Sequence, residues 1–178
     1  GYRNSVFKSE FKGQYIITAV TFELTNVDHK LKTAYGAITT ELKQMGVLAP
    51  TIQDVSKAVI AIRQSKLPDP KKLGNSGSFF KNPVVSKESF ETLLKQFPNM
   101  PNYAVSEMEV KIPAGWLIET AGFKGKTFGN YGIYKDQALV LVNYGGASGR
   151  DILALSKLIQ TTIKTIFGVS LEREVNVI

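Results

Sequence analysis

The chain has no cysteine and a single histidine, His29, among its 178 residues. The lack of cysteine excludes disulfide bonds, thiolate nucleophiles and thiolate metal sites. One histidine in the polar run 26–32 does not make a transition-metal site, so no metal is expected. No apolar run approaches the length of about 18 residues that a membrane span requires. Nothing at the N-terminus resembles a signal peptide, so neither a membrane nor secretion is expected.

The composition is that of a folded globular protein, with 43% hydrophobic residues and a formal net charge of +7. A positive charge favours anionic partners but does not separate nucleic acids from phosphorylated small molecules. The basic residues are spread along the chain and are not interleaved with stacking aromatic residues. This pattern disfavours a nucleic-acid binder and favours a small phosphorylated ligand. It gives no indication of oligomeric state.

Hydrophobic periodicity predicts a mixture of helices and strands, and therefore an α+β fold. Strands are expected at 5–7, 14–24, 108–112, 137–143 and 171–178, the first two joined by a hairpin near Lys12-Gly13. Helices are expected at 35–44, 51–64, 86–97, 113–122 and 148–168. Two of these helices begin with a capping pair, Thr51 with Asp54 and Ser148 with Asp151. Pro68 and Pro70 prevent helix continuation and mark the expected domain boundary.

One stretch, KLPDPKKLGNSGSFFKNPVV, concentrates the residues that indicate a site. Gly74 and Gly77 allow a tight glycine loop with positive φ, which would place Ser78 at its mouth. Two phenylalanines follow and would form a dry wall that strengthens polar contacts beside it. Lys66 and Lys81 flank the loop, so the pattern indicates a serine that lies beside a bound anion. The alternative is a surface turn with scattered lysines, or a serine that caps its own turn.

Two short motifs indicate other functions, but the further residues or the local structure that each motif requires are missing. Ser78 and Lys81 fit the S-x-x-K of penicillin-binding enzymes, yet Pro83 disfavours the helical spacing that this motif needs, and neither S-D-N nor K-T-G occurs. Gly125-Lys126-Thr127 has the end of a P-loop, but Thr120 stands where the earlier glycine is required. Acyl transfer and a P-loop are therefore disfavoured.

The pattern K-L-P-D-P-x-x-x-G-N-x-G-S-F-F-K-N-P resembles the signature of the UDP-N-acetylenolpyruvoylglucosamine reductases, the MurB family of flavoenzymes in peptidoglycan precursor synthesis. G-Y-R-N-S at 1–5, A-G-W-L-I-E at 114–119 and L-E-R-E-V at 171–175 extend the resemblance over the whole chain. The loop around Tyr103 is similar to that of the type I form.

The resemblance implies a C-terminal fragment of such an enzyme. Residues 1–66 would be the C-terminal part of an FAD-binding domain. Residues 67–178 would form a small α+β substrate-binding domain plus a returning C-terminal strand. The chain opens directly in a matched motif and has no glycine-rich loop for the flavin diphosphate. The fragment is therefore expected to lack most of the flavin site and to be inactive by itself.

The resemblance also implies the reaction, its cofactors and its place. In the family, a nicotinamide cofactor reduces FAD, and the flavin passes a hydride to the enolpyruvyl double bond of UDP-N-acetylglucosamine enolpyruvate. The sequence does not separate NADPH from NADH. The product is UDP-N-acetylmuramate. The parent enzyme is accordingly expected to be a cytoplasmic NADPH-dependent oxidoreductase whose partner is the nucleotide sugar.

Site residues follow from matched positions. The family's proton donor corresponds to Ser78, and its arginine and glutamate correspond to Arg3 and Glu174, with Arg3 also contacting the cofactor. Substrate contacts match Tyr35, Lys66, Asn82, Tyr103 and Gln137. The chain departs from the family at Asn176, where arginine is expected, at Arg173, where proline is expected, and at Gly129-Asn130, where a glycine pair is expected.

Two other functions remain open from the residues alone. Arg3 and Glu174, taken without the motifs, are ordinary exposed charges. A non-catalytic module that binds a nucleotide sugar or phosphate would explain the basic loop equally well. A nucleic-acid binder is the third candidate, and it would show strongly salt-dependent retention of DNA or RNA.

Overall fold

The computed structural model describes residue 3 and residues 5–34 and 36–177. Backbone contacts divide the chain into two compact units, Gly1–Ile62 and Arg63–Ile178. Each unit has an apolar core of its own. The division falls inside a helix, slightly before the boundary expected at 66/67. The assignment of the two parts to flavin and substrate stays a prediction.

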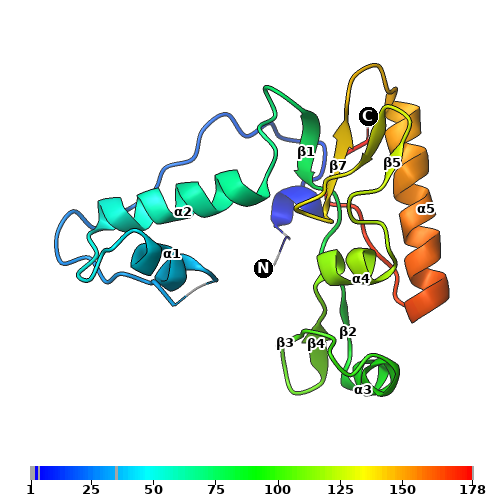
Figure 1. The fold of residues 1–178 in the computed structure, drawn as a ribbon, viewed down its shortest axis with the longest axis horizontal. Coiled ribbons are helices and arrows are strands. Elements are labelled where there is room, and N and C mark those ends of the chain that lie inside the picture. The colour runs from blue at the N-terminus through cyan, green and yellow to red at the C-terminus, as the bar shows by residue number, and fades with distance from the viewer. Residues whose placement is uncertain (1–2, 4, 35, 178) are drawn as a thin grey trace. The chain divides into compact units, whose positions relative to one another are not determined.

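The first unit is built on two packed helices, labelled in Figure 1. They are α1 (Ile38–Gln44) and α2 (Ile52–Lys66), and a short 3-10 helix, η1 (Val6–Lys8), precedes them. The expected capping pair is present: the Asp54 carboxylate accepts hydrogen bonds from the Thr51 hydroxyl at 2.7 Å and the Thr51 N–H at 3.0 Å. These bonds lower the pKa of Asp54 below its ordinary value. The small core joins apolar residues of both helices: Ile38, Leu42, Val55, Ala58, Val59 and Ile62.

The strand expected at 14–24 does not form, and neither do the strand at 5–7 and the hairpin between them. Residues 15–24 have no regular structure, and η1 occupies the place of the first strand. Ile16 and Leu24 are 90% and 81% exposed. A strand needs a neighbour that supplies backbone donors and acceptors, and none of the described residues pairs with this segment. Alternation alone therefore gave the wrong prediction.

The second unit contains two antiparallel sheets (Figure 1). The four-stranded sheet has the order β1 (Gly74–Ser78), β7 (Val140–Asn143), β6 (Tyr131–Ile133) and β5 (Thr127–Phe128). The three-stranded sheet has the order β2 (Val84–Ser86), β4 (Glu109–Lys111) and β3 (Tyr103–Ala104). Strands β4 and β7 thus lie within the segments 108–112 and 137–143, where the sequence predicts strands.

Three helices cover these sheets: α3 (Lys87–Gln96), α4 (Ala114–Thr120) and α5 (Gly149–Phe167). Figure 1 shows α5 running beside the four-stranded sheet, and it contacts β6. Its capping box is complete, because Asp151 accepts from the N–H of Ser148 at 2.8 Å and from its hydroxyl at 2.7 Å. Gly168 ends the helix with φ 67°. The core between helices and sheets includes fully buried residues from each layer: Phe80, Ile112, Leu117, Ile118, Ile133, Ile159 and Ile163.

The α+β class and the helices are confirmed, but two expectations near the site need correction. Residues Gly74–Ser78 form strand β1 instead of an open glycine loop, with a register irregularity between Asn75 and Ser78. Of the two glycines, Gly77 has positive φ, at 68°. The C-terminal strand expected from 171 is reduced to a single bridge between Phe80 and Arg173. Hydrophobic alternation there reflects burial of Leu171 against the core and not a ladder.

Candidate active site

Ser78 is the last residue of β1, where the strand reaches the edge of the core. It lies opposite Val140 of β7 and is half-buried. The next residue is held by a 2.8 Å hydrogen bond from the Phe79 N–H to the Leu139 carbonyl. Phe79 and Phe80 are only 4% and 1% exposed, and their rings meet edge to face at 5.4 Å. The serine therefore sits beside apolar rings, as the sequence predicts.

The C-terminal segment crosses this position and brings Glu174 to it. The Glu174 N–H donates to the Phe79 carbonyl at 2.9 Å, and the Lys81 N–H donates to the Glu172 carbonyl at 2.9 Å. Between these two bonds lies the bridge from Phe80 to Arg173. Two of the three predicted catalytic residues, Ser78 and Glu174, thus stand on neighbouring backbone segments although they are far apart in the sequence.

Lys81, one of the two lysines that the sequence analysis places beside a bound anion, has a carboxylate partner in this structure. Its ammonium group forms an ion pair with the Glu172 carboxylate. This pair ties the crossing segments together and neutralises the lysine charge. Lys66, the other flanking lysine, is the exposed last residue of α2.

Two amide side chains meet the first residues of α4. Asn82 accepts a 2.9 Å hydrogen bond from the Ala114 N–H. The Gln137 oxygen accepts from the Leu139 N–H at 3.3 Å, and it lies 3.5 Å from where a side chain on Gly115 would begin. Both residues use their oxygen to hold backbone, so an NH₂ donor is the group each can offer to a ligand.

The remaining predicted residues lie elsewhere. Tyr103 is in β3 of the three-stranded sheet, 59% exposed, with the Lys111 ammonium 5.6 Å from its ring centre. Arg3 belongs to the first unit, where it is exposed and has φ 53°. Tyr35 falls outside the described residues. The roles of Arg3 and Tyr35 beside Ser78 stay predictions.

Arg173 is a polar residue whose burial the sequence does not reveal. Its Nη1 atom is buried and has no hydrogen-bond partner among the described residues. Buried donors are normally satisfied, so this atom marks a place where an acceptor from a bound group would fit. The only sequence signal is its departure from the proline that the family pattern expects.

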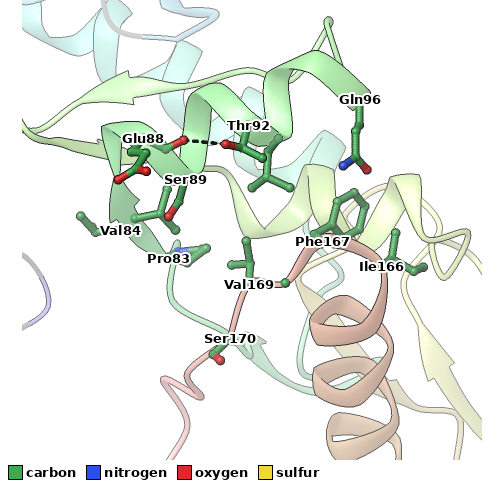
Figure 2. Close-up of a pocket in the computed structure, with 13 residues that line it drawn as sticks. Pro83, Val84, Glu88, Ser89, Thr92, Gln96, Ile166, Phe167, Val169 and Ser170 are labelled. Atoms are coloured by element: carbon green, nitrogen blue, oxygen red, sulfur yellow. Dashed lines mark hydrogen bonds between the residues drawn. The ribbon is translucent and has the colours of Figure 1, made fainter.

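A groove of about 680 Å³ lies in the second unit, between α3 and the end of α5. Figure 2 shows the residues that line it. Its wall from α3 is polar, and Thr92 donates a 3.0 Å hydrogen bond to the Glu88 carbonyl there. Val84, Ile166 and Val169 supply apolar surface. No predicted site residue lines this groove.

No cluster of three or more histidine, aspartate or glutamate side chains that could hold a metal ion is found in residues 3, 5–34 and 36–177. Over the same residues, no helix has both the length and the apolar character needed to cross a membrane.

The sequence of the chain matches a known protein family. A family model described as UDP-N-acetylenolpyruvoylglucosamine reductase, C-terminal domain, matches residues 69–178. The UDP-N-acetylenolpyruvoylglucosamine reductase of Flavobacterium johnsoniae is 61% identical over 178 residues, which are 100% of this chain and 53% of that protein. The reductase of Chromobacterium violaceum is 52% identical over 174 residues, covering 98% of this chain and 51% of that protein.

Among solved structures, the crystal structure of UDP-N-acetylenolpyruvylglucosamine reductase (MurB) from Thermus caldophilus aligns with a TM-score of 0.43 and 24% identity. The alignment covers 70% of this chain and 33% of that chain. The chain spans about half the length of the curated relatives it matches. From the family model and the two sequence relatives, the chain belongs to the UDP-N-acetylenolpyruvoylglucosamine reductase family.

Proposed function

We propose that this chain carries the proton-donating and substrate-binding part of a reductase that converts UDP-N-acetylglucosamine enolpyruvate to UDP-N-acetylmuramate in peptidoglycan precursor synthesis. The observation that carries the proposal is the hydrogen bond from the Glu174 N–H to the Phe79 carbonyl, one residue from Ser78. This bond brings together the motif that contains Ser78 and the motif that contains Glu174. The proposed chemistry requires both motifs at the same site.

Ser78 would hold the proton at its Oγ and give it to the substrate carbon that carries negative charge. A hydroxyl is a weak acid near neutral pH, but a carbanion or enolate is a strong enough base to take its proton. Phe79 and Phe80, the two residues that follow Ser78, are buried, and their rings would exclude water beside it. Exclusion of water strengthens the electrostatic contacts that stabilise the developing charge.

Arg3 and Glu174 would act on that charge. A guanidinium group pairs with the carboxylate of the enolpyruvyl group and draws charge toward it. Lys66, Asn82, Gln137, Tyr103 and Tyr35 would bind the nucleotide sugar. An ammonium group, two NH₂ donors and two phenols are suited to a diphosphate and to sugar hydroxyls.

FAD and NADPH enter this proposal through the family. The donor set near Ser78 fits a flavin in one respect, because Arg173 Nη1 is a buried donor without a partner among the described residues and flavin rings present acceptors. Arg3 is the residue that the family pattern assigns to the flavin. When bound, the flavin supplies the hydride for the double bond.

The test compares Ser78→Ala with Ser170→Ala in the flavin-loaded enzyme that contains this chain. Ser170 is exposed and is not one of the predicted site residues. We expect Ser78→Ala to lower kcat by at least about 100-fold, the range for loss of a general acid, with substrate affinity nearly unchanged. Ser170→Ala should behave as the parent enzyme. Unchanged turnover in Ser78→Ala would overturn the assignment of Ser78 as the proton donor. Binding of the nucleotide sugar without any turnover in the flavin-loaded parent would favour a non-catalytic module.

A further inference from the structure

The groove between α3 and the end of α5 is not used by the proposed reaction. Its volume of about 680 Å³ is within the range of about 300 to 1,000 Å³ typical of ligand sites. Among the described residues, no lysine, arginine or histidine lines it. Nucleotides carry phosphates that bind best to cationic side chains, so a groove without cations is suited to a different class of ligand.

One side of the groove follows the edge of strand β2. Pro83, Val84 and Val85 are consecutive, and all three line the groove. Successive side chains of a strand point to opposite faces of its sheet, so a groove that touches all three lies along the strand edge and not on one face. β2 is the terminal strand in the order β2-β4-β3, so this edge is the one that faces away from β4.

The backbone of Val84 is turned toward this open edge. The Pro83 carbonyl accepts a hydrogen bond from the Ile112 N–H at 2.9 Å, and the Lys87 N–H donates to the Met108 carbonyl at 2.8 Å, so these groups face the β4 side. Backbone groups alternate in direction along an antiparallel strand, so the N–H and carbonyl of Val84 point away from β4. No backbone bond to Val84 from outside the sheet occurs among the described residues. An edge of this kind is a template for pairing with another extended chain.

Helix α3 provides a polar wall with one charge. Glu88, Thr92 and Gln96 are spaced four apart, so they lie on one face of the helix, and all three line the groove (Figure 2). Glu88 is the only charged residue that the described part of the chain contributes to the lining. No ion pair between its carboxylate and a described cation is found. This wall therefore favours a ligand that carries positive charge.

A second wall is apolar. Ile166, Phe167 and Val169 form it, at the end of α5 and just beyond (Figure 2). The helix face from Glu88 to Gln96 is about 12 Å long at a rise of about 1.5 Å per residue. An extended chain covers that length with about four residues. A short extended segment with both apolar and basic side chains therefore matches the groove in length and in chemistry.

We propose that the groove binds an extended segment of a partner protein, which pairs with the edge of β2 and places a lysine or arginine beside Glu88. Addition of a strand to a sheet edge is a common mode of peptide recognition, in which backbone hydrogen bonds supply affinity and side-chain contacts supply specificity. The open edge selects a polypeptide over a small amine, because a polypeptide has the repeating N–H and carbonyl groups that the edge can pair with. The Glu88 carboxylate selects a basic segment over an acidic one.

The experiment titrates the 178-residue chain with synthetic peptides. Three pools of acetylated pentapeptide amides carry valine, leucine or threonine at the outer positions and differ in the central residue, which is lysine, glutamine or glutamate. Backbone amide NMR shifts of Val84 and Val169 are followed, together with deuterium exchange at Val84. We expect the lysine pool to shift both amides and to slow exchange at Val84, because pairing engages its N–H. The glutamate pool should bind at least about fivefold more weakly, because repulsion from Glu88 replaces attraction.

Two pairs of variants test the polar wall. Thr92→Arg places a bulky cation in the groove and should raise the Kd of the lysine pool at least about tenfold. Thr165→Arg is the matched control: both threonines are exposed and helical, and each donates a 3.0 Å hydrogen bond to the carbonyl four residues earlier, but Thr165 does not line the groove. Glu88→Gln should remove the preference for lysine. Glu91→Gln, at an exposed position of α3 that does not line the groove, should keep it.

Equal binding of the three pools, the absence of shifts with the lysine pool, or equal weakening by the two arginine variants would overturn the proposal. Shifts at Val84 and Val169 that appear when the chain alone is concentrated would assign the groove to a second copy and overturn it as well. Neither flavin nor nucleotide sugar is present in this experiment, so the outcome of the Ser78 test has no effect on its result.

Discussion

Asn82 has two chemically different ends, and they serve two different needs. Its oxygen accepts the Ala114 N–H at the start of α4. Its NH₂ group is the part that the proposed function assigns to the nucleotide sugar. A single residue therefore links the local fold to ligand binding, and the two contributions can be separated by choosing which end to remove.

Asn82→Asp keeps an oxygen acceptor and loses the NH₂ donor, whereas Asn82→Ala loses both. We expect Asn82→Ala to lower the free energy of unfolding by about 1 kcal/mol, the usual value of one such hydrogen bond. Asn82→Asp should stay close to the parent in stability yet bind UDP-N-acetylglucosamine more weakly, because a carboxylate repels the diphosphate. Urea unfolding and calorimetric titration measure the two effects. Equal loss of stability in both variants would show that the Asn82 contribution to stability does not come from the hydrogen bond to the Ala114 N–H.

For individual residues, the family motifs predicted more of the candidate site than the local residue pattern did. Ser78 beside buried phenylalanines follows from the local sequence, since adjacent residues stay adjacent in the fold. The approach of Glu174 does not, because it depends on a backbone bond between distant segments. Pairing of Lys81 with Glu172 is missed for the same reason, and the sequence analysis counted that lysine as a ligand group.

Helix caps form between residues close together in the sequence, whereas a strand also needs a partner from another segment. Both capping boxes are formed as expected, because a cap needs only residues three apart in the chain. The strands at 108–112 and 137–143 also form, since each finds a partner within the second unit. The segment at 14–24 and the C-terminal segment fail as strands because the described residues offer no ladder to join.

The cap of α5 gives a prediction about pH. Hydrogen bonds from the Ser148 hydroxyl, and next from its N–H, lower the pKa of Asp151 in the folded protein. A folded pKa below the unfolded one means that the cap contributes stability above the ordinary aspartate range and loses it as the pH falls through the folded value. Asp151→Asn should therefore be less stable than the parent near neutral pH, and the difference should shrink in acid.

Urea unfolding followed by circular dichroism, from about pH 7 down to about pH 3, measures this difference across the range in which aspartates titrate. Asp136→Asn is the control, since Asp136 is exposed and lies outside the helices. A gap between parent and Asp151→Asn that stays constant over the whole range would contradict the assignment.

For the whole molecule, the two units differ in how much apolar surface they bury. The second unit has a core that draws on both sheets and three helices. The first has a small core between α1 and α2, and its residues 15–24 leave several apolar side chains exposed: Tyr15, Ile16, Ile17, Val20, Phe22 and Leu24. Composition alone does not reveal this contrast, because both parts read as ordinary apolar segments.

Limited digestion with chymotrypsin should show the contrast directly. We expect the first cuts after Tyr15 and Phe22, because exposed segments without backbone pairing open at almost no cost in free energy. A piece that contains the second unit should persist. Mass spectrometry of the early products identifies the sites. First cuts after Phe128 or Phe167, within the second unit, would contradict the prediction.

The crossing of the C-terminal segment over residues 79–81 has a further use. The Glu174 amide is held by one bond to the Phe79 carbonyl, outside any ladder. Deuterium uptake at this amide is therefore slow when the crossing is closed and fast when it opens. This one amide reports whether the two halves of the proposed catalytic pair are in place, in protein that carries neither coenzyme nor sugar.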